Sequence, residues 1–226
     1  MTRSARRSDT QKCYDAEAVE GLFEGDSPMD VATPIPTDLG VREHLFSVDD
    51  LGRLAASGVV PPEIRTELVD GRLLEMTPPG PPHGACVMRL ARAIEGALRG
   101  RATVSVQNSF LLSDSTVVMP DVVVLQNRED FYEDCFATAA EALLVVEVGQ
   151  STLDYDRHVK LPRYTAAGVH EVWIVDLDGQ RIERFRQPSA AGYQLVETLQ
   201  PGTTVAPDRL TDVQVDVAWV IGKRAE

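Results

Sequence analysis

The chain has 226 residues, of which 43% are hydrophobic, 25% charged and 6% aromatic, and its formal net charge is −13. This composition is typical of a globular protein and excludes collagen-like, coiled-coil and mucin-like chains, which need a short repeat or a sustained heptad. No apolar run is long enough to span a bilayer, and no apolar segment of a secretory signal follows the basic N-terminus. Three widely spaced cysteines form neither a disulfide nor a zinc pattern. We therefore expect a reduced, cytoplasmic protein with no membrane association.

The charge is unevenly distributed along the chain. Residues 1–12 carry a net charge of +3, and residues 13–50 carry −9. Because residues 1–40 lack hydrophobic periodicity and are rich in turn formers, we predict a disordered or loosely attached acidic tail there. One folded domain is expected over residues 41–222. The negative balance disfavours non-specific binding to phosphate backbones, since lysine and arginine supply most of that affinity.

The first elements of the predicted domain have clear boundary signals. Ser47 to Asp50 has the spacing of a capping box, and it opens a short helix that Gly58 closes. The segment Thr66–Met76 is predicted to form a β-hairpin that turns on Asp70-Gly71, a dipeptide that tolerates the positive φ of a type I′ turn. A longer helix is expected from His83 to Leu98, where apolar residues recur at helical spacing.

The rest of the chain is predicted to be mainly strands with one more helix. The helix is expected within Asp154–Ala167 and ends near Gly168, and the segment Asp212–Ile221 adds one more strand or helix. The domain is therefore predicted to be α/β or α+β, with a mixed β-sheet flanked by helices and β-hairpins at its edges. The expected strands are Ala102–Leu112, Val117–Leu125, Leu143–Val148, Glu171–Leu177, Arg181–Arg186 and Tyr193–Leu199.

Two apolar strands carry a carboxylate where a hydrophobic residue would be expected. Asp121 opens the run Val122–Leu125, and Glu147 follows the run Leu143–Val146. A buried carboxylate is costly unless it is paired or binds a metal, and neighbouring central strands would bring these two side chains together. Oxygen ligands of this kind suit Mg²⁺ or Mn²⁺. The alternative is that each acid lies at a strand end and is solvated.

Lys160 is the cation that would accompany these acids. If the second helix includes it, Asp156, Lys160 and Tyr164 share one face at spacings of four residues. A lysine beside a metal site can orient the attacking water or neutralise charge that develops on a phosphorus centre. The alternative is an ordinary ion pair between Lys160 and Asp156 on a solvated helix face.

Several ordered segments together resemble a known family. They are TELVDGRLLEM, PPGPPHG, PDVVVL, LLVVEVGQST and DRHVKLPRYTAAGVHEVWIVDL, and they span about residues 45 to 200. They are similar to the Uma2 family of restriction-endonuclease-like proteins, within the PD-(D/E)XK nuclease superfamily. The resemblance implies a restriction-endonuclease-like core with a divalent metal, Mg²⁺ or Mn²⁺, at Asp121 and Glu147. It also matches Glu67 to the acidic residue of the first motif and His83 to the histidine that opens the first helix.

The sequence departs from the superfamily pattern at one position. The usual lysine follows the second acid by two residues, and here that position is Gly149. Within the resemblance, Lys160 corresponds to a relocated lysine, and Gln150 is a second residue that would contact the metal-bound water. Tyr164 is expected to pack against the site or to form a hydrogen bond with it.

These observations lead to one main functional hypothesis and two alternatives. The main hypothesis is a divalent-metal-dependent endonuclease that hydrolyses DNA phosphodiester bonds, with Asp121, Glu147, Lys160 and Glu67 as its catalytic residues. The alternatives are an inactive nuclease-like module that binds or regulates another protein, and a hydrolase of small phosphorylated molecules. A homodimer is left open. Arginines around the first helix would supply a local basic strip for DNA; they are Arg89, Arg92, Arg99 and Arg101.

Overall fold

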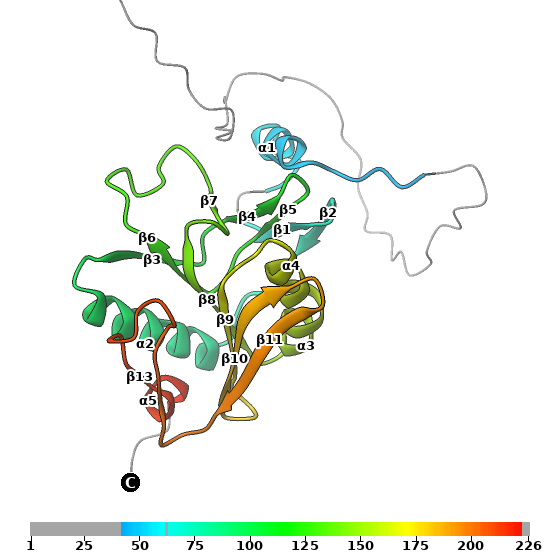
Figure 1. Cartoon of the computed structure of the whole chain (residues 1–226). Coiled ribbons are helices and arrows are strands. Elements are labelled where there is room, and N and C mark those ends of the chain that lie inside the picture. The colour runs from blue at the N-terminus through cyan, green and yellow to red at the C-terminus, as the bar shows by residue number, and fades with distance from the viewer. Residues whose placement is uncertain (1–41, 62, 223–226) are drawn as a thin grey trace, which may run out of the picture.

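A six-stranded sheet forms the centre of the computed structural model, which describes residues 42–61 and 63–222 (Figure 1). The predicted tail over residues 1–40 lies outside the described residues. The strand order is β11-β10-β9-β8-β6-β3; β8 and β9 run parallel, and the other neighbours are antiparallel. The sheet is therefore mixed, as predicted, and β6 and β8 are neighbours within it. Its strands are β3 (Ala102–Val106), β6 (Val122–Gln126), β8 (Ala142–Gly149), β9 (Glu171–Asp176), β10 (Arg181–Ser189) and β11 (Gly192–Leu199).

A second, smaller sheet has the order β2-β1-β5-β4-β7. Two segments predicted as single strands are divided between the sheets, so those two predictions are wrong. Residues 102–112 become β3 and β4, and the chain turns between them where Gln107 adopts a left-handed φ of 54°. Residues 117–125 divide into β5 and β6 around Pro120, which has no N–H for a ladder hydrogen bond. The strands are β1 (Thr66–Val69), β2 (Arg72–Glu75), β4 (Phe110–Ser113), β5 (Thr116–Val118) and β7 (Ala137–Thr138).

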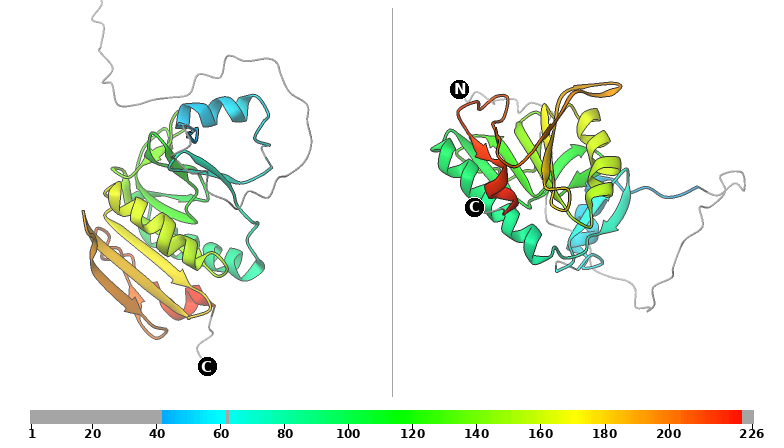
Figure 2. Two further views of the ribbon diagram at one scale, coloured as in Figure 1. Left: turned by 90° about the vertical axis from the view of Figure 1, so that its right-hand side faces the viewer. Right: turned by 90° about the horizontal axis from the view of Figure 1, so that it is seen from below.

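Helices cover both faces of the central sheet (Figure 2). One face packs against α2 and α5, and the other packs against α4 and residues of the small sheet. The segment 212–221 contains a strand and a helix, where one or the other was predicted. The remaining elements are α1 (Val48–Ala56), α2 (Pro81–Leu98), α3 (Leu153–Tyr155), the π-helical turn η2 (Asp156–Lys160), α4 (Leu161–Ala166), β12 (Thr204–Val205), β13 (Val215–Asp216) and α5 (Val217–Ile221).

The direction of each side chain follows from the two-residue period of the strands. In β6, Val122 and Val124 belong to the core beneath α2, whereas Val123 belongs to the core on the α4 side. In β8, Val146 packs beneath α2 and Val145 packs on the α4 side. Asp121 and Glu147 each lie two residues from one of these α4-side valines. Both carboxylates therefore belong to the α4 face of the sheet.

The predicted boundary signals of the first elements are confirmed. The capping box is present, since the Asp50 amide donates to Ser47 Oγ (3.1 Å) and the Ser47 amide donates to Asp50 Oδ2 (2.9 Å). The β1–β2 hairpin turns on Asp70 and Gly71, whose φ values are 49° and 79°. The helix α2 begins at Pro81, two residues before the predicted start, because proline is well suited to the first turn of a helix. Within the described part of the chain, no helix is long and apolar enough to cross a membrane.

Two glycine substitutions test the backbone of this fold in opposite directions. Gly71→Ala should lower the free energy of unfolding by about 1–3 kcal/mol, because its φ is positive and its Cβ would meet Leu45 Cβ at 2.6 Å. Gly96→Ala, inside α2 with no atom within 4 Å of the new Cβ, should raise it by about 0.5–1 kcal/mol. Urea unfolding of both variants measures the contrast, and equal effects would contradict it.

Candidate active site

The register of the central sheet places Asp121 opposite Glu147. Val122 pairs with Val146 in the antiparallel β6–β8 ladder, so the preceding residue of β6 faces the following residue of β8. Asp121 is 7% exposed and Glu147 2% exposed. The alternative in which these acids are solvated at strand ends is therefore wrong. Glu147 also lies within β8, two residues before the end of that strand.

Asp121 is held by three hydrogen-bond donors. The amide of Val148 donates to Oδ2 (2.8 Å), Gln107 Nε2 donates to Oδ1 (3.0 Å), and His83 Nε2 lies 3.0 Å from Oδ2. Burial acts to raise the pKa of Asp121, but the bonds from His83, Gln107 and the Val148 amide outweigh it and hold this pKa below its ordinary value. The Asp121 carboxylate is thus kept ionised.

A buried ammonium joins the remaining acids. Lys160 Nζ lies 2.9 Å from Glu67 Oε1, 3.1 Å from Glu147 Oε1 and 4.0 Å from Asp156 Oδ1. The Lys160 side chain is only 4% exposed, so the alternative of an ion pair with Asp156 on a solvated face is wrong. Tyr164 also donates a hydrogen bond to Glu147 Oε1, so this side chain both packs in the core and contacts the site.

Glu67 belongs to the small sheet, and it completes this arrangement from the other side. Its Oε1 accepts from the amide of Met119 (2.8 Å), and its Oε2 accepts from the Tyr155 hydroxyl (2.9 Å). Glu67 therefore connects β1, the β5–β6 link and the helical segment that carries Lys160. The structure brings all four predicted catalytic residues together.

The pKa values of Glu147 and Lys160 are raised, in contrast to that of Asp121. Burial raises the pKa of Glu147 well above its ordinary value; Lys160 opposes this rise, and the carboxylates of Asp156, Asp121 and Glu67 add to it. Burial disfavours the ammonium of Lys160, but the carboxylates of Glu147 and Glu67 outweigh that cost and raise its pKa. Lys160 therefore stays protonated, and it serves as a hydrogen-bond donor rather than as a base.

Local backbone geometry explains why the lysine lies so far from Glu147 in the sequence. A Cβ at Gly149 would meet Leu153 Cδ1 at 2.7 Å and Leu153 Cα at 2.9 Å, because α3 packs directly over this residue. No lysine side chain fits there. The π-helical turn η2 instead buries both Asp156 and Lys160, whereas His158 between them is exposed.

Other residues surround the cluster at different distances. His83 reaches it through Asp121 alone, and its Nδ1 is buried without a hydrogen-bond partner in the described chain. Gln150 lines the same pocket but is exposed, and its side chain lies 3.5 Å from Asp178 Oδ1, so it contacts none of the carboxylates above. Sequence analysis missed Tyr155 and Gln107. The strand pairing that places Gln107 opposite Asp121 is the signal that would have identified it.

The four carboxylates open onto a pocket of about 110 Å³. Glu67, Asp121, Glu147 and Asp156 line it together with Lys160, and the segment from Met76 to Gly80 forms one wall. Among the described residues, no group of three or more histidine, cysteine, aspartate or glutamate side chains is arranged to hold a metal ion. Asp121 and Glu147 nevertheless fit Mg²⁺, which commonly takes one or two carboxylates and keeps several waters.

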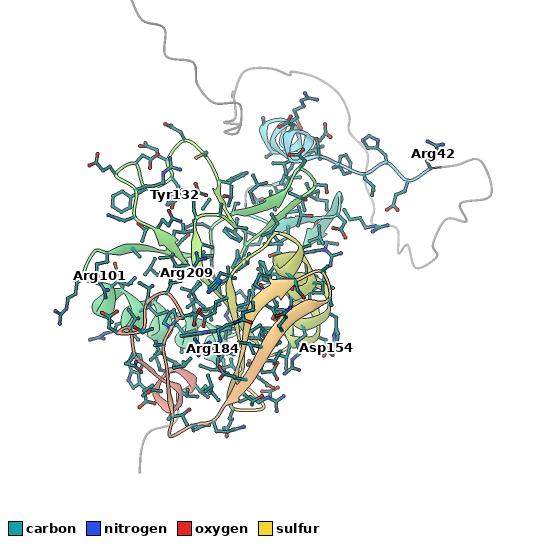
Figure 3. All side chains as sticks on the ribbon, viewed as in Figure 1. Arg42, Arg101, Tyr132, Asp154, Arg184 and Arg209 are labelled. Atoms are coloured by element: carbon teal, nitrogen blue, oxygen red, sulfur yellow. The ribbon has the colours of Figure 1, made fainter. Side chains whose placement is uncertain are left out.

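The predicted basic strip lies apart from this pocket. Arg101 follows the C-terminal end of α2 (Figure 3). His83 and the pocket, by contrast, are at the first turn of that helix. Arg101 pairs with Asp212 (2.6 Å), and Arg89 donates to the carbonyl of Val220 (3.3 Å). Two of the four arginines are thus bonded within the protein, and the strip does not adjoin the carboxylates.

Removal of the buried ammonium should be among the most damaging changes to this fold. Lys160→Met leaves Glu67 and Glu147 buried without their cation and should cost about 3–5 kcal/mol of stability. The double variant with Glu67→Gln should recover part of that loss, because one of the uncompensated charges is gone. Denaturant unfolding of the two single variants and the double variant measures the coupling. A cost below about 1 kcal/mol for Lys160→Met would show that the ammonium is dispensable.

Asp156 should give the protein a measurable pH dependence. Burial, opposed by Lys160, raises its pKa from 3.8 to about 6. The folded state therefore binds more protons than the unfolded state between these values, and stability falls as the pH rises through that interval. Asp156→Asn should melt at a higher temperature than wild type at pH 8, and the difference should shrink toward pH 4. Asp154→Asn, which removes an exposed carboxylate from the outer surface of α3 (Figure 3), is the matched control for the loss of an aspartate side chain.

Comparisons with known proteins identify the fold. The chain is similar to the crystal structure of a putative nuclease belonging to DUF820 from Anabaena variabilis ATCC 29413, with a TM-score of 0.57 and 17% identity over 69% of this chain and 89% of that chain. This likeness shows the fold, so the predicted restriction-endonuclease-like mixed sheet flanked by helices is confirmed. The type IIG restriction endonuclease BpuSI gives a TM-score of 0.32 and 18% identity over 46% of this chain and 11% of that chain, too weak a likeness for any argument. No curated protein matches the chain.

The family assignment rests on the sequence itself. Residues 48–218 match the Uma2 family, whose description is "Putative restriction endonuclease". The match contains the two larger sheets of the described structure, the two-stranded sheet of β12 and β13, α2 and the whole carboxylate cluster. Because it covers far more than half of the chain, this protein belongs to the Uma2 family.

Proposed function

We propose that this protein is a divalent-metal-dependent endonuclease that hydrolyses DNA phosphodiester bonds. Membership of a family described as restriction endonucleases supports a nuclease. The observation that carries the finer proposal is the pairing of Asp121 with Glu147 across two central strands, at the wall of a pocket that also contains a buried lysine. An ordinary structural core would not place so many carboxylates together, since each is costly to bury.

Asp121 and Glu147 are the residues that we assign to Mg²⁺ or Mn²⁺. When bound, the ion would supply positive charge to stabilise the charge that develops on the phosphoryl oxygens. Asp121 is prepared for this role because its three donors keep it ionised. Lys160 and Tyr164 both contact Oε1 of Glu147, and Oε2 is therefore the oxygen that we assign to the cation.

Lys160 has an electrostatic role in this proposal. Its ammonium carries three protons, and Glu67 and Glu147 account for two of them at hydrogen-bond distance. Asp156 Oδ1, at 4.0 Å, is beyond hydrogen-bond distance, and the third proton would donate to a substrate oxygen or to the attacking water in the pocket. Glu67 acts as a positioning residue, because its bonds to Met119 and Tyr155 fix the carboxylate that holds Lys160.

One observation favours the alternative of an inactive binding module. The ammonium of Lys160 pairs with both Glu67 and Glu147 and offsets one of their two negative charges, so these side chains are held together without a metal. Among the described residues, moreover, no group of three or more histidine, cysteine, aspartate or glutamate side chains is arranged to hold a cation. A binding module would retain this fold and cluster while showing no response to divalent ions.

Metal-induced stabilisation separates these proposals. Mn²⁺ should raise the melting temperature of wild type, since an ion at about 100 times its Kd stabilises the folded state by about 2.7 kcal/mol. Asp121→Asn and Glu147→Gln keep the side-chain volume and remove the charge, so both should lose the shift and cleavage of DNA. Glu95→Gln, an exposed acid on α2, should retain both.

The possible outcomes point to different functions. No shift in any variant would contradict the metal site and support the binding module. A shift in wild type without cleavage of any DNA would direct the search to small phosphorylated substrates. DNA cleavage that persists in both charge-neutral variants would show that another site performs the reaction.

A further inference from the structure

The proposed nuclease function leaves one cation of the pocket without a role. Arg65, His83 and Lys160 are the basic side chains among the residues that line it. Lys160 is bonded to carboxylates, and His83 contacts Asp121. Within the described part of the chain, by contrast, no hydrogen bond or ion pair involves the guanidinium of Arg65. Arg65 is half-buried beside several carboxylates and pairs with none of them, so its positive charge is available to a ligand.

The hairpin fixes the direction of Arg65. This residue directly precedes β1, and its carbonyl accepts a hydrogen bond from the Met76 amide (2.8 Å), which extends the β1–β2 ladder by one residue. Side chains alternate along a strand, so Arg65 points to the same side as Glu67. Both line the pocket, whereas Thr66 between them does not. Arg65 and Glu67 therefore line the pocket side by side, from the same strand and its N-terminal extension.

Arg65 changes the formal charge of the pocket. Glu67, Asp121, Glu147 and Asp156 bring four negative charges to the pocket, and Lys160 offsets one of them. With Arg65 and one divalent cation the formal balance is neutral, and without Arg65 it is negative. A phosphodiester carries one negative charge itself, so it would be repelled by the pocket that lacks Arg65.

The first turn of α2 adds positive potential at the same pocket. Gly80 and His83 line the pocket, and Gly80 is the N-cap of this helix of 18 residues. The first turn contains no acidic residue, and Gly80 has no side chain to cap the helix. The positive end of the helix dipole is therefore left to interact with whatever enters the pocket.

We infer that Arg65 binds a non-bridging phosphate oxygen of the polynucleotide backbone, beside the bond that is cleaved. The inference rests on the proposed nuclease function and deepens it, since it assigns a substrate-binding residue to the same site. A guanidinium matches the geometry of phosphate oxygens with two parallel donors. Contact with the backbone makes this part of the affinity independent of base sequence.

Binding measurements on Arg65→Met, which keeps the length of the side chain and removes its charge, test the inference. The probes are a labelled single-stranded oligonucleotide and the corresponding duplex, followed by fluorescence anisotropy at several salt concentrations. Ca²⁺ replaces Mg²⁺ so that binding is measured without turnover. Arg65→Met should weaken binding by about tenfold or more and lower the slope of log Kd against log salt by about 1. Arg65→Lys should fall between the two proteins, because it keeps the charge but loses the paired donors.

The controls separate this inference from the proposed function. Arg209→Met, an exposed arginine between β12 and β13 and outside the pocket, should leave affinity and salt slope unchanged. Arg65→Met should keep the Mn²⁺-induced melting shift of wild type, which shows that the fold and the metal site are intact. Cleavage by wild type with equal affinity in Arg65→Met overturns the role of Arg65 and leaves the nuclease in place. If Arg65→Met binds more weakly but wild type cleaves no DNA, Arg65 binds phosphate in a protein that is not a nuclease. If wild type does not bind DNA at all, both the role of Arg65 and the nuclease function are overturned.

Discussion

The structure depends on one buried ion cluster, in which an ammonium and two carboxylates come from three different parts of the chain. Lys160 comes from the helical segment, Glu147 from the central sheet and Glu67 from the small sheet. Each of these charges would be costly to bury without an opposite charge beside it. These charges can pair with one another only when the two sheets and the helical segment pack together. The packing that stabilises the fold therefore also assembles the site.

The irregular features around Lys160 are consequences of this constraint. Gly149 lets Leu153 approach the end of β8, and this close contact starts the helical segment directly over the strand that bears Glu147. The π-helical turn that follows buries Asp156 and Lys160 together, and Tyr164 in the next helix closes over Glu147. π-Helical turns are often found at functional sites.

Sequence patterns predicted the parts of this architecture that depend on local chemistry. The Asp70-Gly71 turn and the capping box at Ser47 follow from backbone preferences, and the proximity of Asp121 and Glu147 follows once their strands are taken as neighbours. The division of residues 117–125 between two sheets was missed, although Pro120 and Asp121 interrupt the apolar run and a proline inside such a run marks a strand boundary. The contact between Glu67 and Lys160 depends on how those sheets pack, so spacing along the chain could not predict it.

The two central carboxylates meet in unlike electrostatic environments, and this difference bears on what the site does. Donors on one side hold the pKa of Asp121 low, whereas burial and neighbouring acids raise the pKa of Glu147. Environments that separate the pKa values of paired acids are a feature of catalytic sites. A cluster that served stability alone would gain more from apolar residues of similar volume, because a buried ionic group seldom stabilises a fold as well as they do. Retaining Asp121 as an ion that faces Glu147 fits a site that a cation enters, since added positive charge favours the ionised form of both carboxylates.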